Sequence, residues 1–414
     1  MDSAALTAAL QTFEGLYPKT IELSLDRIES VLETLGRPQD KLPPTIHVAG
    51  TNGKGSTCAY LRAMAEEAGL RVHVYTSPHL VRFNERTRLA GTLIEDDALI
   101  EWIRRVHDAL EGRPITRFEA TTAVALLAFS EVPADLLVLE VGLGGRFDAT
   151  NIIDHPALSV ITPVDFDHKQ FLGSDLAFIA GEKAGIIKPG RPVVSAIQAR
   201  VCGDVIARQA AELEAPLTVL RMEDIEKVPE RVALPGTHQR YNAALAGLAM
   251  RTLNVPSVPD GAIWNGAQSA VWPARMQRLS DGPVTRLGGG ADVWLDGGHN
   301  PHAATAIAEL LREMGGRTIM VTAMIASKDH GGFFHPFKGV VEAVHTIPNA
   351  PGHASAPPET LAETARAFLP NATAFGALEE AMRAAADLKP DRILIGGSLY
   401  LAGEVLAANQ EIPV

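Results

Sequence analysis

Short apolar runs rich in β-branched residues alternate along the chain with longer segments rich in Ala, Leu and Glu. Such runs are typical of strands buried on both faces, and the longer segments are typical of the helices that connect parallel strands. In the first part of the chain the pattern predicts strands at 45–49, 71–75, 135–141, 157–162 and 192–196. It predicts helices at 55–69, 95–111, 119–130 and 201–214. We therefore expect an α/β fold with a mostly parallel sheet.

A second series of the same kind follows later in the chain. Its predicted strands lie near 292–296, 317–323, 340–346 and 391–395, and its predicted helices near 302–314, 358–368, 377–387 and 398–408. The polar turn Ser280-Asp281-Gly282-Pro283 falls between the two series. We therefore expect two α/β domains, a larger one at 1–279 and a smaller one at 280–414.

Composition narrows the class of protein. The 414 residues are 46% hydrophobic and 21% charged, which is typical of a globular protein of two or three domains. A net charge of -12 argues against a nucleic-acid partner. Cys58 and Cys202 form no metal or disulfide pattern, and charged residues and a proline interrupt the apolar stretch 120–141. We expect a cytoplasmic protein with no membrane partner.

The segment 46–57 carries the strongest local signal, because an apolar strand runs into a glycine-rich turn and then into a helix. Backbone N–H groups of such a turn and the helix N-terminus bind phosphate oxygens, and Lys54 adds a positive charge. Ser56 or Thr57 offers a hydroxyl group to Mg²⁺. The segment differs from the usual G-x-x-x-x-G-K-[ST] pattern at two positions, because Val48 replaces the first glycine and Gly55 replaces the hydroxyl residue. A plain glycine turn is therefore the alternative.

Polar residues also follow several predicted strands. Glu140 ends an apolar run, and Asp167 and His168 follow the next strand, at the edge where ligands bind in open α/β sheets. Carboxylates and imidazoles there suit a metal–phosphate reaction, although each residue alone could be a solvated cap or a structural histidine. Lys183 lies on a predicted helix, where an exposed cation is the alternative. His299 and the turn at 396–398 could simply precede a capped helix.

Ordered motifs continue through both predicted domains, at 50–56, 76–80, 82–86, 118–119, 140–146, 148–151, 167–168, 182–186, 238–239, 242–245, 296–302 and 397–404. Together they resemble the folate branch of the Mur ligase superfamily over nearly the whole chain. This branch comprises folylpolyglutamate synthases and the bifunctional dihydrofolate synthase/folylpolyglutamate synthases. The glycine between Lys54 and Ser56 separates the folate enzymes from the cell-wall ligases.

The resemblance implies an ATP-dependent amide ligase with a P-loop domain followed by a Rossmann-like domain. Its substrates would be L-glutamate, dihydropteroate and reduced folates, joined through an acyl phosphate. ATP and Mg²⁺, bound at two metal sites, would be required, and a monovalent cation is a further candidate. A monomer is expected.

The resemblance also implies residue roles. Catalytic residues would be Lys54, His168 and Lys183, the last matching a lysine that the family carbamylates. Nucleotide contacts would come from Thr51, Asn52, Gly53, Lys54, Gly55, Ser56, Thr57, Asn242, Arg275, Asp296 and His299. Metal ligands would be Ser56, Ser77, Glu140 and His168. Pterin contacts would come from Ser77, Pro78, His79, Phe83, Asn84 and Arg86.

Three alternatives remain open from the sequence. One is a folylpolyglutamate synthase without dihydrofolate synthase activity. Another is a Mur-type ligase for a peptidoglycan precursor or a cyanophycin-like substrate, against which the spacing of Lys54-Gly55-Ser56 argues. The third is a nucleotide-binding module without catalysis, which would have no need of Glu140, His168 and Lys183 together.

Overall fold

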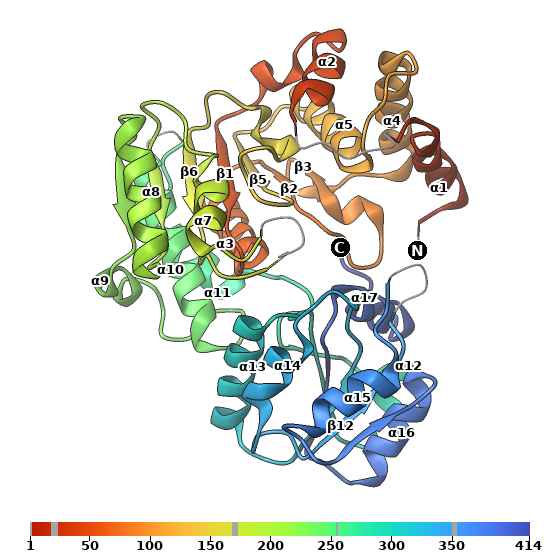
Figure 1. Cartoon of the computed structure of the whole chain (residues 1–414). Coiled ribbons are helices and arrows are strands. Elements are labelled where there is room, and N and C mark those ends of the chain that lie inside the picture. The colour runs from red at the N-terminus through yellow and green to blue at the C-terminus, as the bar shows by residue number, and fades with distance from the viewer. Residues whose placement is uncertain (1, 18–23, 168–172, 254–255, 350–353) are drawn as a thin grey trace. The chain divides into compact units, whose positions relative to one another are not determined.

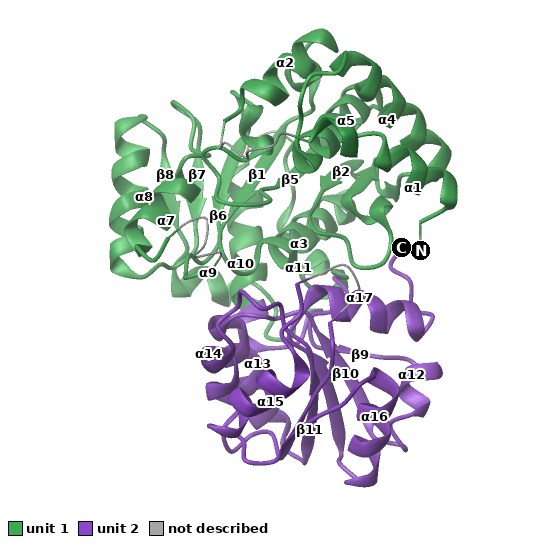
Figure 2. Cartoon of the chain, turned by 45° about the vertical axis from the view of Figure 1, so that its right-hand side comes forward, with its two compact units in different colours: residues 1–233, 240–271 green, residues 234–239, 272–414 purple. Residues whose placement is uncertain are grey.

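The computed structural model describes residues 2–17, 24–167, 173–253, 256–349 and 354–414 and divides into two compact units (Figure 2). The first comprises Met1–Ala233 with Arg240–Val271, and the second comprises Leu234–Gln239 with Trp272–Val414. Each unit carries its own sheet and its own cluster of buried apolar side chains. The arrangement confirms the predicted α/β fold with mostly parallel strands.

The first unit is built on an eight-stranded sheet of order β4-β3-β2-β5-β1-β6-β7-β8. Its strands are β1 (Thr45–Ala49), β2 (Val72–Tyr75), β3 (Thr87–Leu89), β4 (Thr92–Leu93), β5 (Leu136–Glu140), β6 (Leu158–Ile161), β7 (Val193–Ser195) and β8 (Leu217–Val219). Neighbouring strands from β2 to β8 in this order pair in parallel. Strand β3 pairs antiparallel with both β2 and β4. The C-terminal ends of β2, β5, β1 and β6 therefore lie side by side at one edge.

The helices of the first unit are α1 (Ala4–Gln11), α2 (Asp26–Thr34), α3 (Lys54–Glu67), α4 (Asp96–Leu110), α5 (Arg117–Glu131), α7 (Leu176–Ala184), α8 (Arg200–Glu212), α9 (Met222–Glu226), α10 (Thr237–Thr252) and α11 (Asp260–Ser269). Helices α1, α2, α4 and α5 gather on one side and share a core cluster with Leu137 and Leu139 of β5 (Figure 1). Helix α11 packs tightly on α3, because Gly266 lies directly against the backbone of Met64. Such backbone approach requires the missing side chain of glycine.

The second unit has a six-stranded sheet of order β13-β12-β11-β14-β10-β9. Its strands are β9 (Gln277–Arg278), β10 (Asp292–Asp296), β11 (Thr318–Thr322), β12 (Ala343–Thr346), β13 (Ala372–Ala374) and β14 (Arg392–Gly396). Its helices are α12 (Pro283–Arg286), α13 (Pro301–Met314), α14 (His330–Phe334), α15 (Pro358–Arg366), α16 (Leu378–Asp387) and α17 (Leu399–Ala408). Phe333, Phe334 and Phe337 are buried in its core.

The division between the units falls earlier than the predicted boundary at 279/280. Residues 277–278 form strand β9, which pairs antiparallel with β10 through Gln277 and Leu295. They therefore belong to the second sheet, although the polar turn follows them. Within the described ranges, no helix has both the length and the apolarity needed to cross a membrane.

Candidate functional site

The turn between β1 and α3 is shaped by two glycines that have no room for a side chain. Gly50 has φ +150° and lies directly against the hydroxyl of Thr162. Gly53 has φ +83°, and a Cβ there would lie 2.6 Å from Oδ1 of Asn242. The turn is thus held between the exit of β6 and helix α10.

Only part of the backbone of this turn is available to a phosphate group. The N–H groups of Thr51 and Asn52 both donate to the carbonyl oxygen of Pro163, at 3.0 and 3.2 Å. The hydrogen-bond ladder of α3 begins at Thr57, whose N–H donates to the Gly53 carbonyl. The N-terminus of α3, which begins at Lys54, precedes that ladder and faces the turn, as in sites that bind an anion.

Two of the predicted metal ligands lie together at the ends of neighbouring strands. The Ser77 N–H, just after β2, donates to Oε2 of Glu140 at the end of β5, at 3.1 Å. Glu140 is buried, and its charge helps to raise the pKa of the Cys58 thiol, after the larger effect of burial. A hydroxyl and a carboxylate are oxygen donors of the kind that hard divalent cations prefer.

The remaining predicted ligands are less fully placed. Ser56 is buried in the first turn of α3. His168 lies outside the described residues. Among the residues that the structure describes, no three His, Cys, Asp or Glu side chains come close enough to hold a metal ion by themselves.

Lys183 is buried rather than exposed, with 4% of its surface accessible, which excludes the alternative of a solvated helical cation. Two glycines let the turn after β5 pack against the end of α7. A Cβ at Gly145 would lie 2.6 Å from the Glu182 carbonyl oxygen, and one at Gly185 would lie 2.5 Å from Cβ of Arg146. This contact holds Lys183 against the first sheet.

The buried position changes the protonation of Lys183. Burial, and then repulsion by the Lys54 ammonium, lower its pKa to about 7, while Asp167, Asp148 and Glu182 act in the opposite direction. The structure thus brings the predicted catalytic lysines within electrostatic reach of each other. The lowered pKa makes the neutral, nucleophilic amine of Lys183 more accessible near neutral pH than that of an ordinary lysine.

The segment after β2 presents a histidine, an aromatic ring and an arginine as one cluster. Nε of Arg86 donates to Nδ1 of His79 at 2.8 Å, and the Arg86 guanidinium lies 5.4 Å from the centre of the Phe83 ring. Pro78 follows Ser77 through a cis peptide bond. Asn84 differs from its neighbours, because its amide donates to the carbonyl of Ile94 and to Asp96. Its amide nitrogen thus holds the neighbouring segment, while its Oδ1 is buried without a hydrogen bond.

The predicted nucleotide contacts of the second unit form a compact group of their own. Asp296, at the end of β10, accepts the N–H of Met276 at 2.8 Å and that of Gly298 at 2.6 Å. Burial raises the pKa of Asp296, and the Arg275 guanidinium opposes that effect. Nδ1 of His299 lies 3.0 Å from the Gly297 carbonyl oxygen, which orients its ring.

Comparison with known proteins identifies the family. Residues 274–399 match the family model described as "Mur ligase, glutamate ligase domain". The dihydrofolate synthase/folylpolyglutamate synthase of Bacillus subtilis (strain 168) is 36% identical over 361 residues, which cover 80% of this chain and 80% of that protein. The chain belongs to the dihydrofolate synthase/folylpolyglutamate synthase family. It is an ATP-dependent ligase that attaches glutamate to folates.

Solved structures of related ligases have the same fold. That of Escherichia coli FolC in complex with DHPP and ADP has a TM-score of 0.86 and 32% identity, and the match covers 98% of each chain. The bifunctional folylpolyglutamate synthase/dihydrofolate synthase of Yersinia pestis, complexed with AMPPNP and Mn ion, has a TM-score of 0.83 and 32% identity, with 99% of each chain covered.

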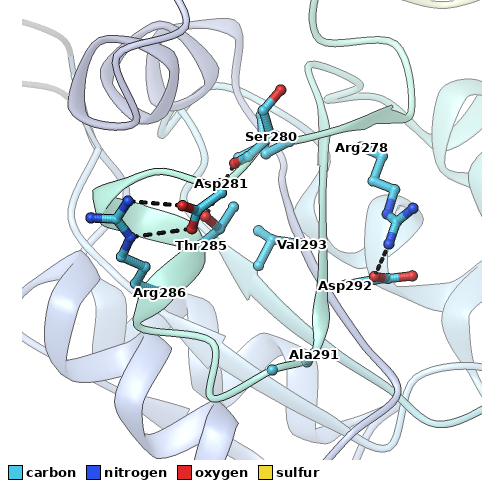
Figure 3. Close-up of a pocket in the computed structure, with 10 residues that line it drawn as sticks. Arg278, Ser280, Asp281, Thr285, Arg286, Ala291, Asp292 and Val293 are labelled. Carbon is cyan, nitrogen blue, oxygen red and sulfur yellow. Dashed lines mark hydrogen bonds and ion pairs between the residues drawn. The ribbon is translucent and has the colours of Figure 1, made fainter.

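A cavity of about 650 Å³ in the second unit of the ligase lies apart from the predicted nucleotide contacts of that unit (Figure 3). It opens beside Asp292 at the N-terminal end of β10, whereas Asp296 ends the same strand. The charged residues around it already form ion pairs, Arg278 with Asp292 and Arg286 with Asp281.

Sequence reasoning missed two side chains that organise the ligase site. Asp148 is buried and accepts the N–H groups of Leu143 and Thr150, at 2.8 and 3.0 Å, which fixes the glycine-rich turn after β5. Asn151 donates to the carbonyl oxygens of both Arg146 and Gly185, at 2.9 and 3.1 Å. Both residues lie in the motif at 148–151. Asp148 was the signal available in the sequence, because aspartate often caps a short turn.

Proposed function

We propose that this ligase joins L-glutamate both to dihydropteroate and to the γ-carboxylate of reduced folates, through an acyl phosphate. The observation that carries the proposal is the first sheet's site: the Ser77 N–H donates to Glu140 where two neighbouring strands end, and the Lys54 ammonium lowers the pKa of the buried Lys183. The titles of the related structures support it, since FolC was solved with DHPP and ADP and the Yersinia pestis protein with AMPPNP and Mn ion.

ATP would bind with its phosphates at the first turn of α3. Lys54 and the N–H groups there offer positive charge, and Asn242 backs the turn at Gly53. The contacts of the turn with Pro163 support a role for Thr51 and Asn52 in shaping it. Arg275, Asp296 and His299 of the second unit are the further nucleotide contacts that we propose.

Mg²⁺ would be held by Ser77 and Glu140, with Ser56 and His168 contributing ligands at two sites. A bound divalent cation supplies charge neutralisation to the phosphoryl group during its transfer. The oxygen-rich donor set favours Mg²⁺ or Mn²⁺ over softer metals. We also include a monovalent cation among the proposed cofactors and assign no residues to it.

In the first step, a carboxylate oxygen of the pterin substrate would attack the γ-phosphorus of ATP, and ADP would leave. In the second step the glutamate amine would attack the acyl carbon, lose a proton and expel inorganic phosphate. Lys54 stabilises the charge of the transferred group. The neutral amine of Lys183 can react with CO₂, and the carbamate so formed would add a negative group beside Lys54.

The pterin would bind along the segment from Ser77 to Arg86. The Phe83 ring and the Arg86 guanidinium already face each other, and His79 bonds to Arg86. The side chains of His79 and Arg86 offer hydrogen-bonding groups to a flat heterocycle. The Phe83 ring is buried, with 3% of its surface accessible, and would support them. Pro78 would fix the approach of the chain to the heterocycle. Asn84 is a further proposed substrate contact, through its Oδ1, since its amide nitrogen already donates to Ile94 and Asp96.

We further propose that the first unit is the ATP-binding domain, that the second is the C-terminal ligase domain, and that the ligase acts as a monomer. The whole proposal is tested by ADP release from purified ligase with ATP and Mg²⁺. We expect release to require both L-glutamate and a pterin acid, with dihydropteroate and tetrahydrofolate each serving as acceptor. Activity with tetrahydrofolate alone would restrict the function to polyglutamate synthesis. ADP release that ignores both substrates would contradict the ligase mechanism.

A further inference from the structure

The four residues that follow β6, Thr162 to Asp165, connect the phosphate-binding turn to the segment that carries Asp167. On the side of the turn, the Thr51 hydroxyl donates to the carbonyl oxygen of Asp165 at 2.9 Å and accepts its N–H at 3.0 Å. The Pro163 carbonyl oxygen also accepts two N–H groups of the turn. The position of this strand exit therefore determines where the phosphate-binding turn lies.

Gln198, just after β7, holds the other side of the same four residues. Its Oε1 accepts the N–H of Val164 at 3.0 Å. Its Nε2 donates to the carbonyl oxygen of Thr162 at 3.1 Å and to Oγ of Ser195 at 3.3 Å. One side-chain amide thus bonds to the backbone on both sides of Pro163.

These hydrogen bonds replace those that the sheet no longer provides. Strand β6 ends at Ile161, and the Thr162 N–H still donates to the carbonyl oxygen of Ala49. Beyond this point Pro163 has no N–H to offer, and the chain leaves the strand register. Backbone groups without a partner are costly to bury, so the amide of Gln198 decides which path the strand exit takes.

We propose that Gln198 is a positioning residue for the ligase reaction, which fixes the exit of β6 and through it the phosphate-binding turn. The inference rests on the proposed function, because the position of this turn matters for catalysis only if ATP binds there. Gln198 itself contacts neither substrate nor nucleotide. Without the amide of Gln198, the Val164 N–H and the Thr162 carbonyl oxygen lose a hydrogen bond each. The Pro163 carbonyl then shifts away from the N–H groups of Thr51 and Asn52. Asp167, whose charge acts on Lys183, follows in the same segment and shifts with it.

The experiment compares Gln198→Met with wild type. Methionine keeps the length of the side chain and removes its hydrogen bonds. Gln268→Met is the matched control, because Gln268 is an exposed residue of α11. The affinity for ADP with Mg²⁺ is measured by calorimetry at 25 °C, together with kcat, the KM for ATP and the melting temperature. We expect Gln198→Met to weaken ADP binding and to lower kcat about tenfold each, whereas Gln268→Met changes neither.

Gln198→Glu provides a second readout that a purely structural role would not move. The ionised carboxylate would still accept the Val164 N–H but would repel the carbonyl oxygen of Thr162, whereas the protonated acid would donate to it. The kcat of Gln198→Glu relative to wild type should therefore rise as the pH is lowered toward the pKa of the new carboxyl group. The relative kcat of Gln198→Met should not depend on pH.

The proposal fails if Gln198→Met retains wild-type ADP affinity and kcat, even when its melting temperature falls, because Gln198 would then support only the fold. The proposed function fails separately, if wild-type ligase forms ADP without requiring L-glutamate and a pterin acid. The ADP affinities of the variants do not depend on that outcome, so the two failures are distinguishable.

Discussion

The ammonium group of Lys54 lowers the pKa of Lys183, although Lys54 begins α3 and Lys183 lies in the last turn of α7. Burial has the larger effect and brings the pKa of Lys183 to about 7. The chain therefore retains a buried amine that is costly to protonate, close to a fixed positive charge. Such an arrangement is typical of a functional site rather than of a core optimised for stability.

Replacing Lys183 by methionine should stabilise the protein. The unfolded chain holds a proton on this lysine up to its ordinary pKa of 10.5, whereas the folded chain releases it near 7, so stability should rise with pH across that interval. Lys183→Met should remove this dependence and raise the free energy of unfolding at pH 7 by roughly 4 kcal/mol. Urea unfolding in bicarbonate-free buffer at pH 7 and pH 10 measures the effect.

Lys41→Met is the control for this experiment, because Lys41 is an exposed residue of the same unit. It should leave the free energy of unfolding unchanged at both pH values. Equal stabilities of wild type and Lys183→Met at pH 7 would show that the charge of Lys183 is not desolvated in solution.

Loss of the amine should also abolish turnover. Lys183→Ala removes the group that we expect to carry the carbamate, but it leaves the first turn of α3 intact. ADP affinity should therefore stay within about threefold of wild type, which is less than the effect of one hydrogen bond. Formate or acetate should restore part of the activity, because a small carboxylate can occupy the place of the carbamate. Unchanged turnover in Lys183→Ala would contradict a chemical role for this residue.

A side chain at Gly53 should weaken nucleotide binding. A Cβ there would lie 2.6 Å from Oδ1 of Asn242, in addition to the strain of φ +83°. Gly69→Ala is a matched control, because Gly69 has φ +78° with open space around it. Each variant should lose about 1 kcal/mol of stability from backbone strain, but only Gly53→Ala should bind ADP more weakly. Calorimetric titration together with thermal unfolding separates the two effects.

Glu140 should be required for binding of the divalent cation. Glu140→Gln keeps the size of the side chain and removes the negative charge that a cation would meet beside Ser77. We expect Mn²⁺, titrated in the presence of ADP and followed by electron paramagnetic resonance, to bind at least about tenfold more weakly. The exposed Glu95 provides the control Glu95→Gln. Equal Mn²⁺ affinity in the Glu140 variant would place the metal elsewhere.

The elements best predicted from sequence were those with long, uniform patterns. Strand β1 has the bounds predicted for 45–49, because all five of its residues are buried and β-branched and apolar residues dominate it. The hairpin of β3 and β4 and the strand β9 were not predicted, since two or three residues are too few to show a period. Strand β9 also moved the division between the units, because pairing with β10 is not visible in local composition.

The residue types of the site were readable from sequence, but their surroundings were not. Glu140 was predicted at a strand end, yet its contact with Ser77 depends on which strands are neighbours in the sheet. The burial of Lys183 depends on two glycines that let a distant turn pack against α7. Asn84 lies within a predicted substrate motif, but its amide is used by Ile94 and Asp96. Long-range packing decided each case.

Both sheets end in very short strands. The outer strands of the first sheet are β4, with two residues, and β8, with three. Those of the second are β13, with three residues, and β9, with two. Each border therefore offers few backbone groups onto which another molecule could add a strand. Molecules with a net charge of -12 also repel one another. The short outer strands and this repulsion should together limit aggregation through strand addition at high protein concentration.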